Sequence, residues 1–402
     1  MLAPAEIEAA RQRLKGAIYE TPCPYSQTLS EISGVRCFVK LENLQMTGSF
    51  KERGAANLLL QLDPAERARG VAAASAGNHG LAVAFHAARL GIGAVIVMPE
   101  WAPLIKVTSS RRHGAEVILA GANYDDAYGR AREIATERGL TFVHPFDDER
   151  VIAGQGTLGL ELLEQRPDMD AVVIPIGGGG LIAGAALAIK SVRPQVRVIG
   201  VQAEALPSMQ RALAARTRVT LPAASTIADG ISVRQVGELT HALASRYVDD
   251  VVTATEEELA NAILLLLEIE KTVVEGAGAA PLAALLNRKL GLEGRTVVLV
   301  LSGGNIDVTM ISRIIERGLV KDGRLVRLGV ILRDQPGALA RLTALIAECR
   351  ANIVHIEHDR AFSHAAIGES RVELTLETAG REQIDAVKQR LVEAGYGLEE
   401  PF

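Results

Sequence analysis

Short apolar runs alternate with longer helical patterns between about residues 70 and 320. Continuous apolar strands that alternate with helices are typical of parallel sheets covered on both faces. Such sheets bind ligands beyond the carboxyl ends of their strands. The pattern therefore predicts an α/β fold, whose expected buried strands are residues 71–75, 94–99, 115–119, 142–144, 171–176, 196–202 and 296–301.

The pattern of predicted elements changes after the polar segment Lys321-Asp322-Gly323-Arg324, which we interpret as a linker. The strand, turn and helix signals after it predict the order βαββαβ of a small ferredoxin-like domain. The predicted domains are therefore residues 1–321 and 322–402. The expected elements of the second are strands at 325–332, 353–360 and 371–377, helices at 338–349 and 381–394, and a short tail.

Composition excludes several classes of protein. Hydrophobic residues make up 48% and charged residues 23% of the 402 residues, and the net charge of -5 gives no electrostatic footprint for nucleic acid. Residues 171–189 carry no charge, but Pro175 and four glycines in their middle argue against a membrane span. The three widely spaced cysteines, and the absence of an apolar core in residues 1–15, predict a cytoplasmic protein with reduced thiols.

Polar residues crowd into positions 40–55, between a strand and an apolar helix, and Lys51 stands where that helix is predicted to begin. A lysine that acts as a Schiff-base nucleophile needs a partly desolvated, electropositive setting, because this favours the neutral amine. The positive end of the helix and nearby Arg53 are expected to supply it. The alternative is a solvated lysine at the surface.

The stretch Thr47-Gly48-Ser49-Phe50-Lys51-Glu52-Arg53-Gly54-Ala55 resembles the cofactor-lysine motif of the threonine and serine dehydratases, which are fold-type II pyridoxal-phosphate enzymes. The resemblance implies two open parallel-sheet α/β subdomains. It also implies that Lys51 holds pyridoxal 5'-phosphate covalently beside Phe50 and, once freed, removes the α-proton of the substrate. The implied reaction is β-elimination of L-threonine to 2-oxobutyrate and ammonia, or of L-serine to pyruvate.

Four consecutive glycines, Gly177, Gly178, Gly179 and Gly180, follow a predicted strand and open a helix with Leu181. Glycines let backbone N–H groups approach an anion, and the helix dipole adds attraction. The motif is neither a Walker loop nor the G-x-G-x-x-G fingerprint. In the resembled family this loop binds the cofactor phosphate, and the alternative is a plain turn.

A second strand-to-helix turn consists of Ser75, Ala76, Gly77, Asn78 and His79. Its exposed N–H groups are predicted to bind the substrate carboxylate by anion capture at a helix start. The resemblance implies that Asn78 contacts the phenolic oxygen of the cofactor, whereas Asn at such a turn is otherwise a helix cap. We assign His79 no catalytic role.

Ser302 ends the strand predicted at 296–301, and the resemblance implies that it meets the pyridine nitrogen of the cofactor. A hydroxyl makes the ring a weaker electron sink than a carboxylate would, which suits β-elimination. Glu275, in a segment that also resembles the dehydratases, is expected near the cofactor. The alternative for Glu275 is a carboxylate that ends a helix before Gly276.

Other functions were weighed against dehydration. Serine racemases of the family carry serine where this chain has Ala76, and a methyl group cannot relay a proton. Their metal-site carboxylate matches Glu204, but Gln210 replaces the aspartate six residues later, so no metal site is predicted. Cysteine synthase, dehydratases of 3-hydroxyaspartate or phenylserine, and a non-catalytic amino-acid sensor remain alternatives. One departure from many threonine dehydratases is that Gly80-Leu81-Ala82 follows the Asn-His pair, where they carry glutamine.

The turn Leu332-Arg333-Asp334-Gln335-Pro336-Gly337-Ala338-Leu339 resembles the first strand–helix turn of an ACT domain. The resemblance implies a regulatory amino-acid site, with isoleucine or valine as effector and a place in isoleucine biosynthesis, in a homodimer or homotetramer. The alternative is a domain used only for subunit contacts. His355, His358 and His364 are not predicted to bind metal, because positions 355 and 358 face opposite sides of a strand.

Overall fold

A computed structural model describes residues 2–360 and 366–399, which divide into two compact units, Met1–Ile306 and Asp307–Phe402. The helix α14 (Val308–Lys321) falls in the second unit, so the domain boundary after residue 321 remains a prediction from the sequence. The helices of the first unit are α1 (Pro4–Leu14), α2 (Gln27–Ser33), η1 (Glu42–Leu44), α3 (Lys51–Leu60), α4 (Pro64–Arg69), α5 (Asn78–Arg89), α6 (Leu104–Arg112), α7 (Tyr124–Arg138), α8 (Glu149–Gln165), α9 (Gly180–Val192), α10 (Ser208–Ala215), η2 (Asp229–Ile231), α11 (Glu238–Tyr247), α12 (Glu256–Glu268) and α13 (Gly276–Leu286).

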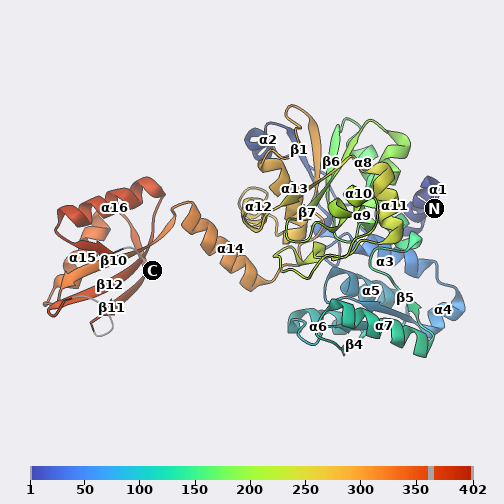
Figure 1. The fold of residues 1–402 in the computed structure, drawn as a ribbon, viewed down its shortest axis with the longest axis horizontal. Helices are drawn as coiled ribbons and strands as arrows, with labels where there is room; N and C mark the ends of the chain where they lie inside the picture. Colours follow the sequence, from blue (N-terminus) through green and yellow to red (C-terminus); the bar gives the residue numbers. More distant parts are fainter. Residues whose placement is uncertain (1, 361–365, 400–402) are drawn as a thin grey trace. The chain divides into compact units, whose positions relative to one another are not determined.

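Two parallel sheets form the two lobes of the first unit (Figure 1). The larger sheet has the strand order β1-β9-β6-β7-β8, and its strands are β1 (Arg36–Lys40), β6 (Ala171–Pro175), β7 (Arg197–Ala203), β8 (Asp250–Ala254) and β9 (Thr296–Val300). The smaller sheet has the order β4-β3-β2-β5, and its strands are β2 (Val71–Ala74), β3 (Ala94–Met98), β4 (Glu116–Leu119) and β5 (Thr141–Phe142). The parallel α/β fold class is therefore confirmed.

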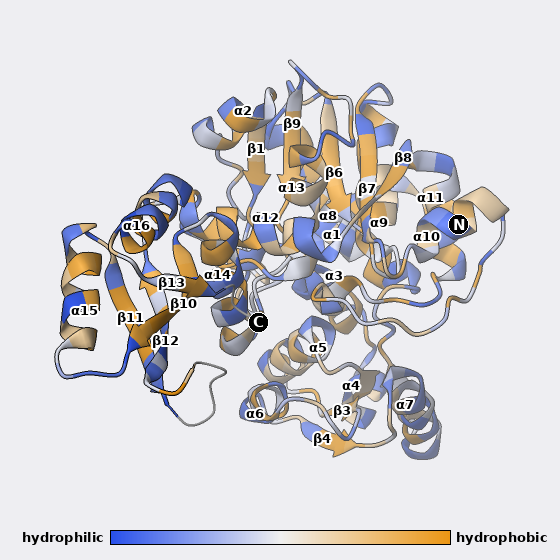
Figure 2. Cartoon of the chain, turned by 60° about the vertical axis from the view of Figure 1, so that its left-hand side comes forward, coloured by the Kyte–Doolittle hydropathy of each residue, from blue (hydrophilic) through white to orange (hydrophobic). Residues whose placement is uncertain are grey.

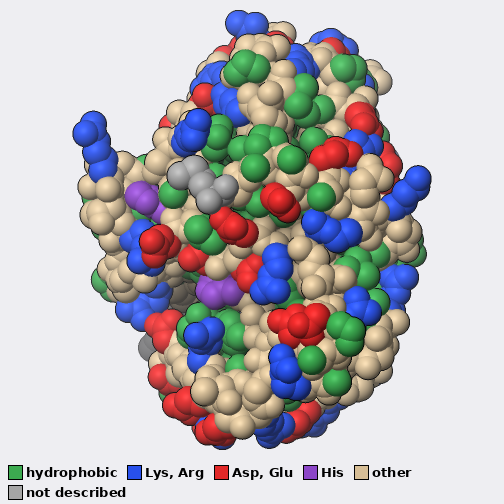
Figure 3. All heavy atoms as spheres, turned by 90° about the vertical axis from the view of Figure 1, so that its right-hand side faces the viewer, with side chains coloured by type: hydrophobic (Ala, Val, Ile, Leu, Met, Phe, Trp, Pro, Cys, Tyr) green, Lys and Arg blue, Asp and Glu red, His purple; other side chains and the backbone are tan. Residues whose placement is uncertain are grey.

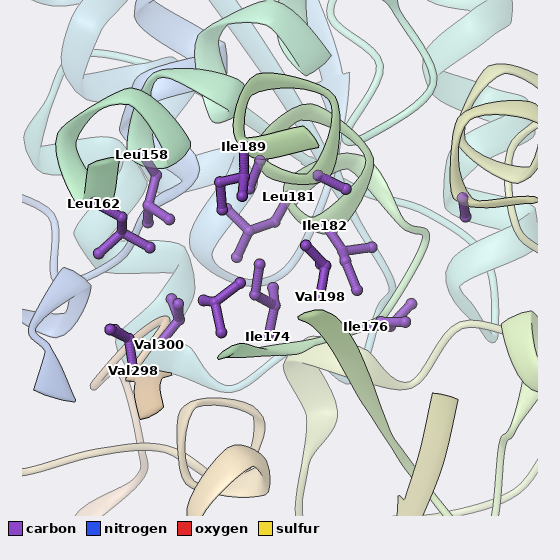
Figure 4. Close-up of a cluster of buried hydrophobic side chains, with 14 of the residues drawn as sticks. Leu158, Leu162, Ile174, Ile176, Leu181, Ile182, Ile189, Val198, Val298 and Val300 are labelled. Carbon is purple, nitrogen blue, oxygen red and sulfur yellow. The ribbon is translucent and has the colours of Figure 1, made fainter. Parts of the chain in front are cut away.

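Apolar strands between amphipathic helices create the core of the larger lobe. Figure 2 shows the strands of this sheet as hydrophobic ribbons, and β6 and β9 are buried along their whole length. In Figure 4 the side chains of α8 and α9 lie in one cluster with those of the strands. The helix residues include Leu158, Leu162, Leu181, Ile182 and Ile189, and the strand residues include Ile174, Val198 and Val298. Because Leu181 belongs to this cluster, the glycine loop that precedes it is anchored directly to the core.

The second unit contains α14 (Val308–Lys321), β10 (Leu325–Arg333), α15 (Ala338–Glu348), β11 (Asn352–Asp359), β12 (Glu369–Glu377), α16 (Arg381–Glu393) and β13 (Gly397–Glu399). Its strands pair antiparallel in the order β11-β12-β10-β13. The βαββαβ order predicted after residue 322 is confirmed. Alternate residues of β12 are buried, which is the pattern of a sheet covered on one face.

Two details of the strand prediction were wrong. The strand expected at 142–144 is β5, a two-residue strand that ends at Phe142, because the chain there leaves the smaller sheet and crosses to the larger lobe. The edge strands β1 and β8 were missing from the expected set. Both begin with an exposed charged residue, so their apolar runs are shorter than those of the central strands.

Among the described residues no helix is long and apolar enough to cross a membrane. The stretch at 171–189 is the buried strand β6, the glycine loop and most of α9. On the face shown in Figure 3, positive and negative side chains are interspersed.

Candidate active site

Lys51 is the first residue of α3, and the loop before this helix is fixed against the larger sheet. The N–H of Phe50 donates to the Ser302 carbonyl at 3.0 Å, and Nζ of Lys51 donates to the Pro145 carbonyl at 2.9 Å. Burial lowers the pKa of the Lys51 amine to about 8, against the opposing attraction of Glu275. A large fraction of this amine is therefore neutral in mildly alkaline solution.

Arg53 does not supply the electropositive setting that the sequence suggested. Its guanidinium is fully buried and bonds Glu42 at 2.7 Å and Glu161 at 2.5 and 2.8 Å. Lys40 bonds Glu161 at 2.6 Å from another side. These charges satisfy one another and hold α3 against α8, so the lowered pKa of Lys51 results from burial and not from Arg53.

The glycine loop makes a tight strand-to-helix turn. Gly179 has φ +98°, a left-handed conformation that glycine adopts without strain. A Cβ on Gly178 would lie 2.2 Å from the ring of Phe146, so the ring packs directly on the backbone of the loop. Among the described residues no backbone acceptor pairs with the N–H groups of Gly178, Gly179 or Gly180. These groups at the start of α9 are free to bind an anion.

The turn after β2 begins α5 at Asn78. Ser75 Oγ accepts the N–H of Gly77 at 3.1 Å, and Ala76 packs against the core of the smaller lobe. His79 is buried, its Nε2 bonds the Val143 carbonyl at 2.9 Å, and burial lowers its pKa to about 3. The imidazole is therefore neutral and fixed in the fold.

Glu275 lies at the junction of the two lobes. The Asn78 amide donates to Glu275 Oε1 at 2.8 Å, and Asn305 in turn donates to Asn78 Oδ1 at 2.8 Å. Burial raises the pKa of Glu275 to about 7, and the nearby charge of Asp229 adds to the effect. Glu275 precedes α13 as its N-cap, so the alternative of a carboxylate that ends a helix was wrong.

Ser302 lies two residues after the end of β9 and is buried. Its neighbour Gly303 is pressed against the carboxylate of Glu275, because a Cβ there would lie 2.5 Å from Oε1. Ser49 forms an isolated antiparallel bridge with Gly303, which brings the end of β9 beside the loop that leads to Lys51.

The structure thus connects the predicted site residues through two series of contacts. One runs from Lys51 through the segment that contains Pro145 and Phe146 to Gly178, and the other runs from Asn78 through Glu275 to Gly303. Sequence reasoning missed Pro145, Phe146 and Asn305. The dense run of polar and aromatic residues at 144–148 is the signal that would have indicated Pro145 and Phe146.

The described residues among those considered for metal do not assemble a metal site. Gln210 donates to the Val251 carbonyl at 2.8 Å, and within residues 2–360 and 366–399 no group of three or more His, Cys, Asp or Glu side chains is placed to hold an ion. His358 bonds Ser370 Oγ at 3.0 Å. His364 lies outside the described residues.

The second unit contains a pocket of about 370 Å³ at the turn between β10 and α15. Gly337, with φ +82°, is the N-cap of α15 at its edge. Arg360 Nε lies 3.0 Å from Asp334 Oδ1. The pocket is lined by Leu332, Arg333, Asp334, Gln335, Pro336, Gly337, Ala338, Leu339, His358, Arg360 and Ser370.

Each of the two units matches a known protein family. The family described as pyridoxal-phosphate dependent enzyme matches residues 14–303, and the ACT domain family matches residues 326–395. An L-threonine ammonia-lyase of Thermotoga maritima is 49% identical over 98% of this chain and 98% of its own length.

Two solved structures are similar to the catalytic unit. The processed form of threonine deaminase isoform 2 from Solanum lycopersicum has a TM-score of 0.74 and 36% identity, and covers 78% of this chain and 91% of its own. A maize serine racemase has a TM-score of 0.75 and 34% identity, and covers 80% of this chain and 98% of its own. These matches agree with the parallel α/β fold and with the site formed by the lysine and the glycine loop. The chain therefore belongs to the family of pyridoxal-phosphate dependent enzymes and carries an ACT domain at residues 326–395.

Proposed function

We propose that this chain removes water and then ammonia from L-threonine to give 2-oxobutyrate, and acts in the same way on L-serine to give pyruvate. The observation that carries the proposal is the Lys51 amine at the start of α3, whose pKa burial lowers to about 8. The name of the Thermotoga maritima relative, L-threonine ammonia-lyase, favours threonine as the substrate.

The residues present fit the cofactor pyridoxal 5'-phosphate. Unpaired N–H groups at Gly178, Gly179 and Gly180 suit a phosphate dianion at the positive end of α9, with Gly177 and Leu181 completing the loop. Lys51 would hold the cofactor covalently beside Phe50, and Asn78, Glu275 and Ser302 would face its ring. When bound, the cofactor supplies an electron sink for negative charge at the substrate α-carbon.

The chain's own residues account for orientation and proton transfer. The N–H groups at the start of α5, after Ser75, Ala76 and Gly77, bind the substrate carboxylate. The freed Lys51 amine, neutral because it is desolvated, takes the proton from the α-carbon as a general base. Ser302 offers a neutral hydroxyl instead of a carboxylate, which favours loss of the β-hydroxyl over reactions that need long-lived negative charge.

A serine racemase is the second candidate, because the maize serine racemase has the same fold at 34% identity. Racemisation needs a second proton donor on the face opposite Lys51. Ala76, which packs against the core of the smaller lobe, has a methyl group that cannot transfer a proton. A chiral assay with L-serine tests this, and rapid formation of D-serine would overturn the dehydratase assignment.

We further propose that the ACT domain binds an amino-acid effector, isoleucine or valine, in the pocket beside Gly337. The pocket combines an aliphatic lining that includes Leu332 and Leu339 with the opposite charges of Asp334 and Arg360. An amino acid carries both charges, so each of these two side chains offers it a partner. We propose, in addition, that the protein is a cytoplasmic homodimer or homotetramer and functions in isoleucine biosynthesis.

One experiment tests the central proposal. Purified full-length chain is assayed for keto-acid release from L-threonine, L-serine and bulkier β-hydroxy amino acids, and its absorbance is recorded with added pyridoxal phosphate. Lys51→Ala is expected to abolish both turnover and the absorbance of lysine-bound cofactor, whereas Lys15→Ala, at an exposed position, leaves both unchanged. A colourless wild-type chain, or full activity in Lys51→Ala, would refute the proposal.

A further inference from the structure

The segment at residues 143–148 connects the two lobes and passes through the site. It leaves the smaller sheet after β5 and enters α8, which packs on α3 and α9. Along the way the Val143 carbonyl bonds His79 at 2.9 Å, and the Pro145 carbonyl accepts from Lys51 Nζ at 2.9 Å. One short segment thus contacts both the turn that begins α5 and the lysine that begins α3.

The same segment holds the glycine loop from two directions. The ring of Phe146 lies on Gly178, where no side chain would fit. Asp147 accepts the N–H groups of Glu238 and Leu239, each at 2.9 Å, and so caps α11. Within α11, the hydroxyl of Thr240 donates to the Gly178 carbonyl at 2.7 Å. A shift of the segment would therefore move both the lysine amine and the loop predicted to bind phosphate.

The conformation of this segment depends on one imidazole. His144 Nδ1 accepts the N–H of Phe146 at 3.2 Å and that of Asp147 at 2.7 Å. The ring stands edge-on to Phe146, with centroids 4.7 Å apart and an interplanar angle of 90°, and a second edge contact is made with Tyr128. An Nδ1 that accepts two hydrogen bonds cannot carry a proton, so the turn exists only with neutral histidine.

His144 is neutral near pH 7, chiefly because it is buried. Burial lowers its pKa to about 4, and the positive charges of Lys51 and Arg132 act in the same direction. Asp147 and Asp148 oppose the shift. The imidazole is therefore neutral, and its Nδ1 can accept both hydrogen bonds, at the pH where Lys51 loses its proton.

We propose that His144 is a positioning residue for Lys51: its unprotonated Nδ1 folds the turn that aims the Pro145 carbonyl at the lysine amine and places Phe146 on the glycine loop. The Pro145 carbonyl holds the free amine in the position from which it takes and returns a proton. This inference rests on the proposed role of Lys51 as the cofactor lysine, but it assigns a function to residues outside that role.

Three substitutions, His144→Asn, His144→Gln and His144→Phe, distinguish the effect of the hydrogen-bond acceptor from that of the aromatic ring. Asn is the matched replacement, because its Oδ1 is as many bonds from Cα as Nδ1 of histidine, whereas Oε1 of Gln is one bond further. His144→Phe keeps the aromatic packing on Phe146 and Tyr128 but has no acceptor. Two readouts apply to each variant: kcat and KM of the holoenzyme with L-threonine, and the rate at which cofactor-stripped full chain regains visible absorbance with pyridoxal phosphate, which follows the amine without turnover.

His144→Gln and His144→Phe are expected to lower kcat by about 10- to 100-fold with little change in KM, because a misplaced base costs rate and not substrate binding. They are also expected to regain absorbance several times more slowly. His144→Asn should stay within about threefold of the wild type in both readouts. The comparison of Asn with Gln keeps the test valid if the Phe variant does not fold.

Equal behaviour of Asn and Gln, or wild-type values in Gln and Phe, would overturn the positioning role. A loss in all three that follows only their melting temperatures would show a structural role and would overturn it as well. These outcomes differ from failure of the proposed function, in which the wild-type chain itself neither attaches pyridoxal phosphate at Lys51 nor releases keto acid.

Discussion

The side-chain amide of Asn78 donates a 2.8 Å hydrogen bond to Glu275 Oε1, which joins the first residue of α5 in the smaller lobe to the N-cap of α13 in the larger lobe. Neither residue is close to the other in sequence, and each sits at the start of a helix. The bond orients the amide and places a buried carboxyl group beside the Lys51 amine, on whose pKa its charge acts. A titratable group of the larger lobe, the Glu275 carboxyl, is therefore bonded to the smaller lobe.

The first prediction concerns pH and Glu275. Its pKa in the folded chain is raised to about 7 from an ordinary 4.5, so the folded state holds the proton more tightly than the unfolded state. This contribution to stability is fully present below the ordinary pKa and is lost as the pH rises through about 7. Urea unfolding of cofactor-free chain from mildly acidic to mildly alkaline pH should show the loss in the wild type and not in Glu275→Gln. Parallel curves for the two proteins would contradict it.

The second prediction concerns the glycine loop. Gly178→Ala places a Cβ 2.2 Å from the Phe146 ring, so either the ring or the loop must move. We expect a loss of about 1–3 kcal/mol in stability and weaker binding of pyridoxal phosphate, measured by urea unfolding and by absorbance titration. Gly129→Ala in α7 is the control, because nothing lies within 4 Å of its Cβ. It should stabilise the chain by up to about 1 kcal/mol, and equal losses in both variants would contradict the packing argument.

The third prediction concerns the buried ion cluster behind Lys51. Arg53→Met removes the ion-pair partner of the buried Glu42 and leaves Glu161 with Lys40 alone. The expected loss in free energy of unfolding is about 3–5 kcal/mol. Arg130→Met breaks an exposed pair with Glu133, which should cost less than about 1 kcal/mol. Urea unfolding of the two variants at neutral pH measures the difference, and a small effect of Arg53→Met would show that the cluster does not hold α3.

The fourth prediction concerns the effector pocket. Gly337 has φ +82° and lines the pocket, so Gly337→Ala strains the turn that begins α15. Isoleucine titrated into the wild type should change keto-acid release, and Gly337→Ala should weaken this response without altering activity in its absence. Gly395→Ala, with a similar φ of +85° but outside the pocket, should respond like the wild type. An absent response in the wild type would remove isoleucine as the effector.

Local patterns in the sequence determined much of the architecture and the position of the candidate site. Central strands such as β6 and β9 were predicted because both faces are buried, which requires a continuous apolar run. Lys51 and Gly178 were indicated because the motif around the lysine and the glycine turn each consist of a few adjacent residues. The edge strands β1 and β8 were missed because each begins with an exposed charged residue, which shortens the apolar run.

What only the tertiary structure decided are the pairings between distant segments. The sequence does not relate Lys51 to Pro145, and it does not show that Asn78 donates to Glu275, because the residues of each pair lie far apart in the chain. The sequence also suggested that Arg53 polarises the site, whereas folding pairs it with Glu42 and Glu161. Residue type determines which chemistry is available, but the pKa and the orientation of each group depend on burial and on neighbours that only the folded chain brings together.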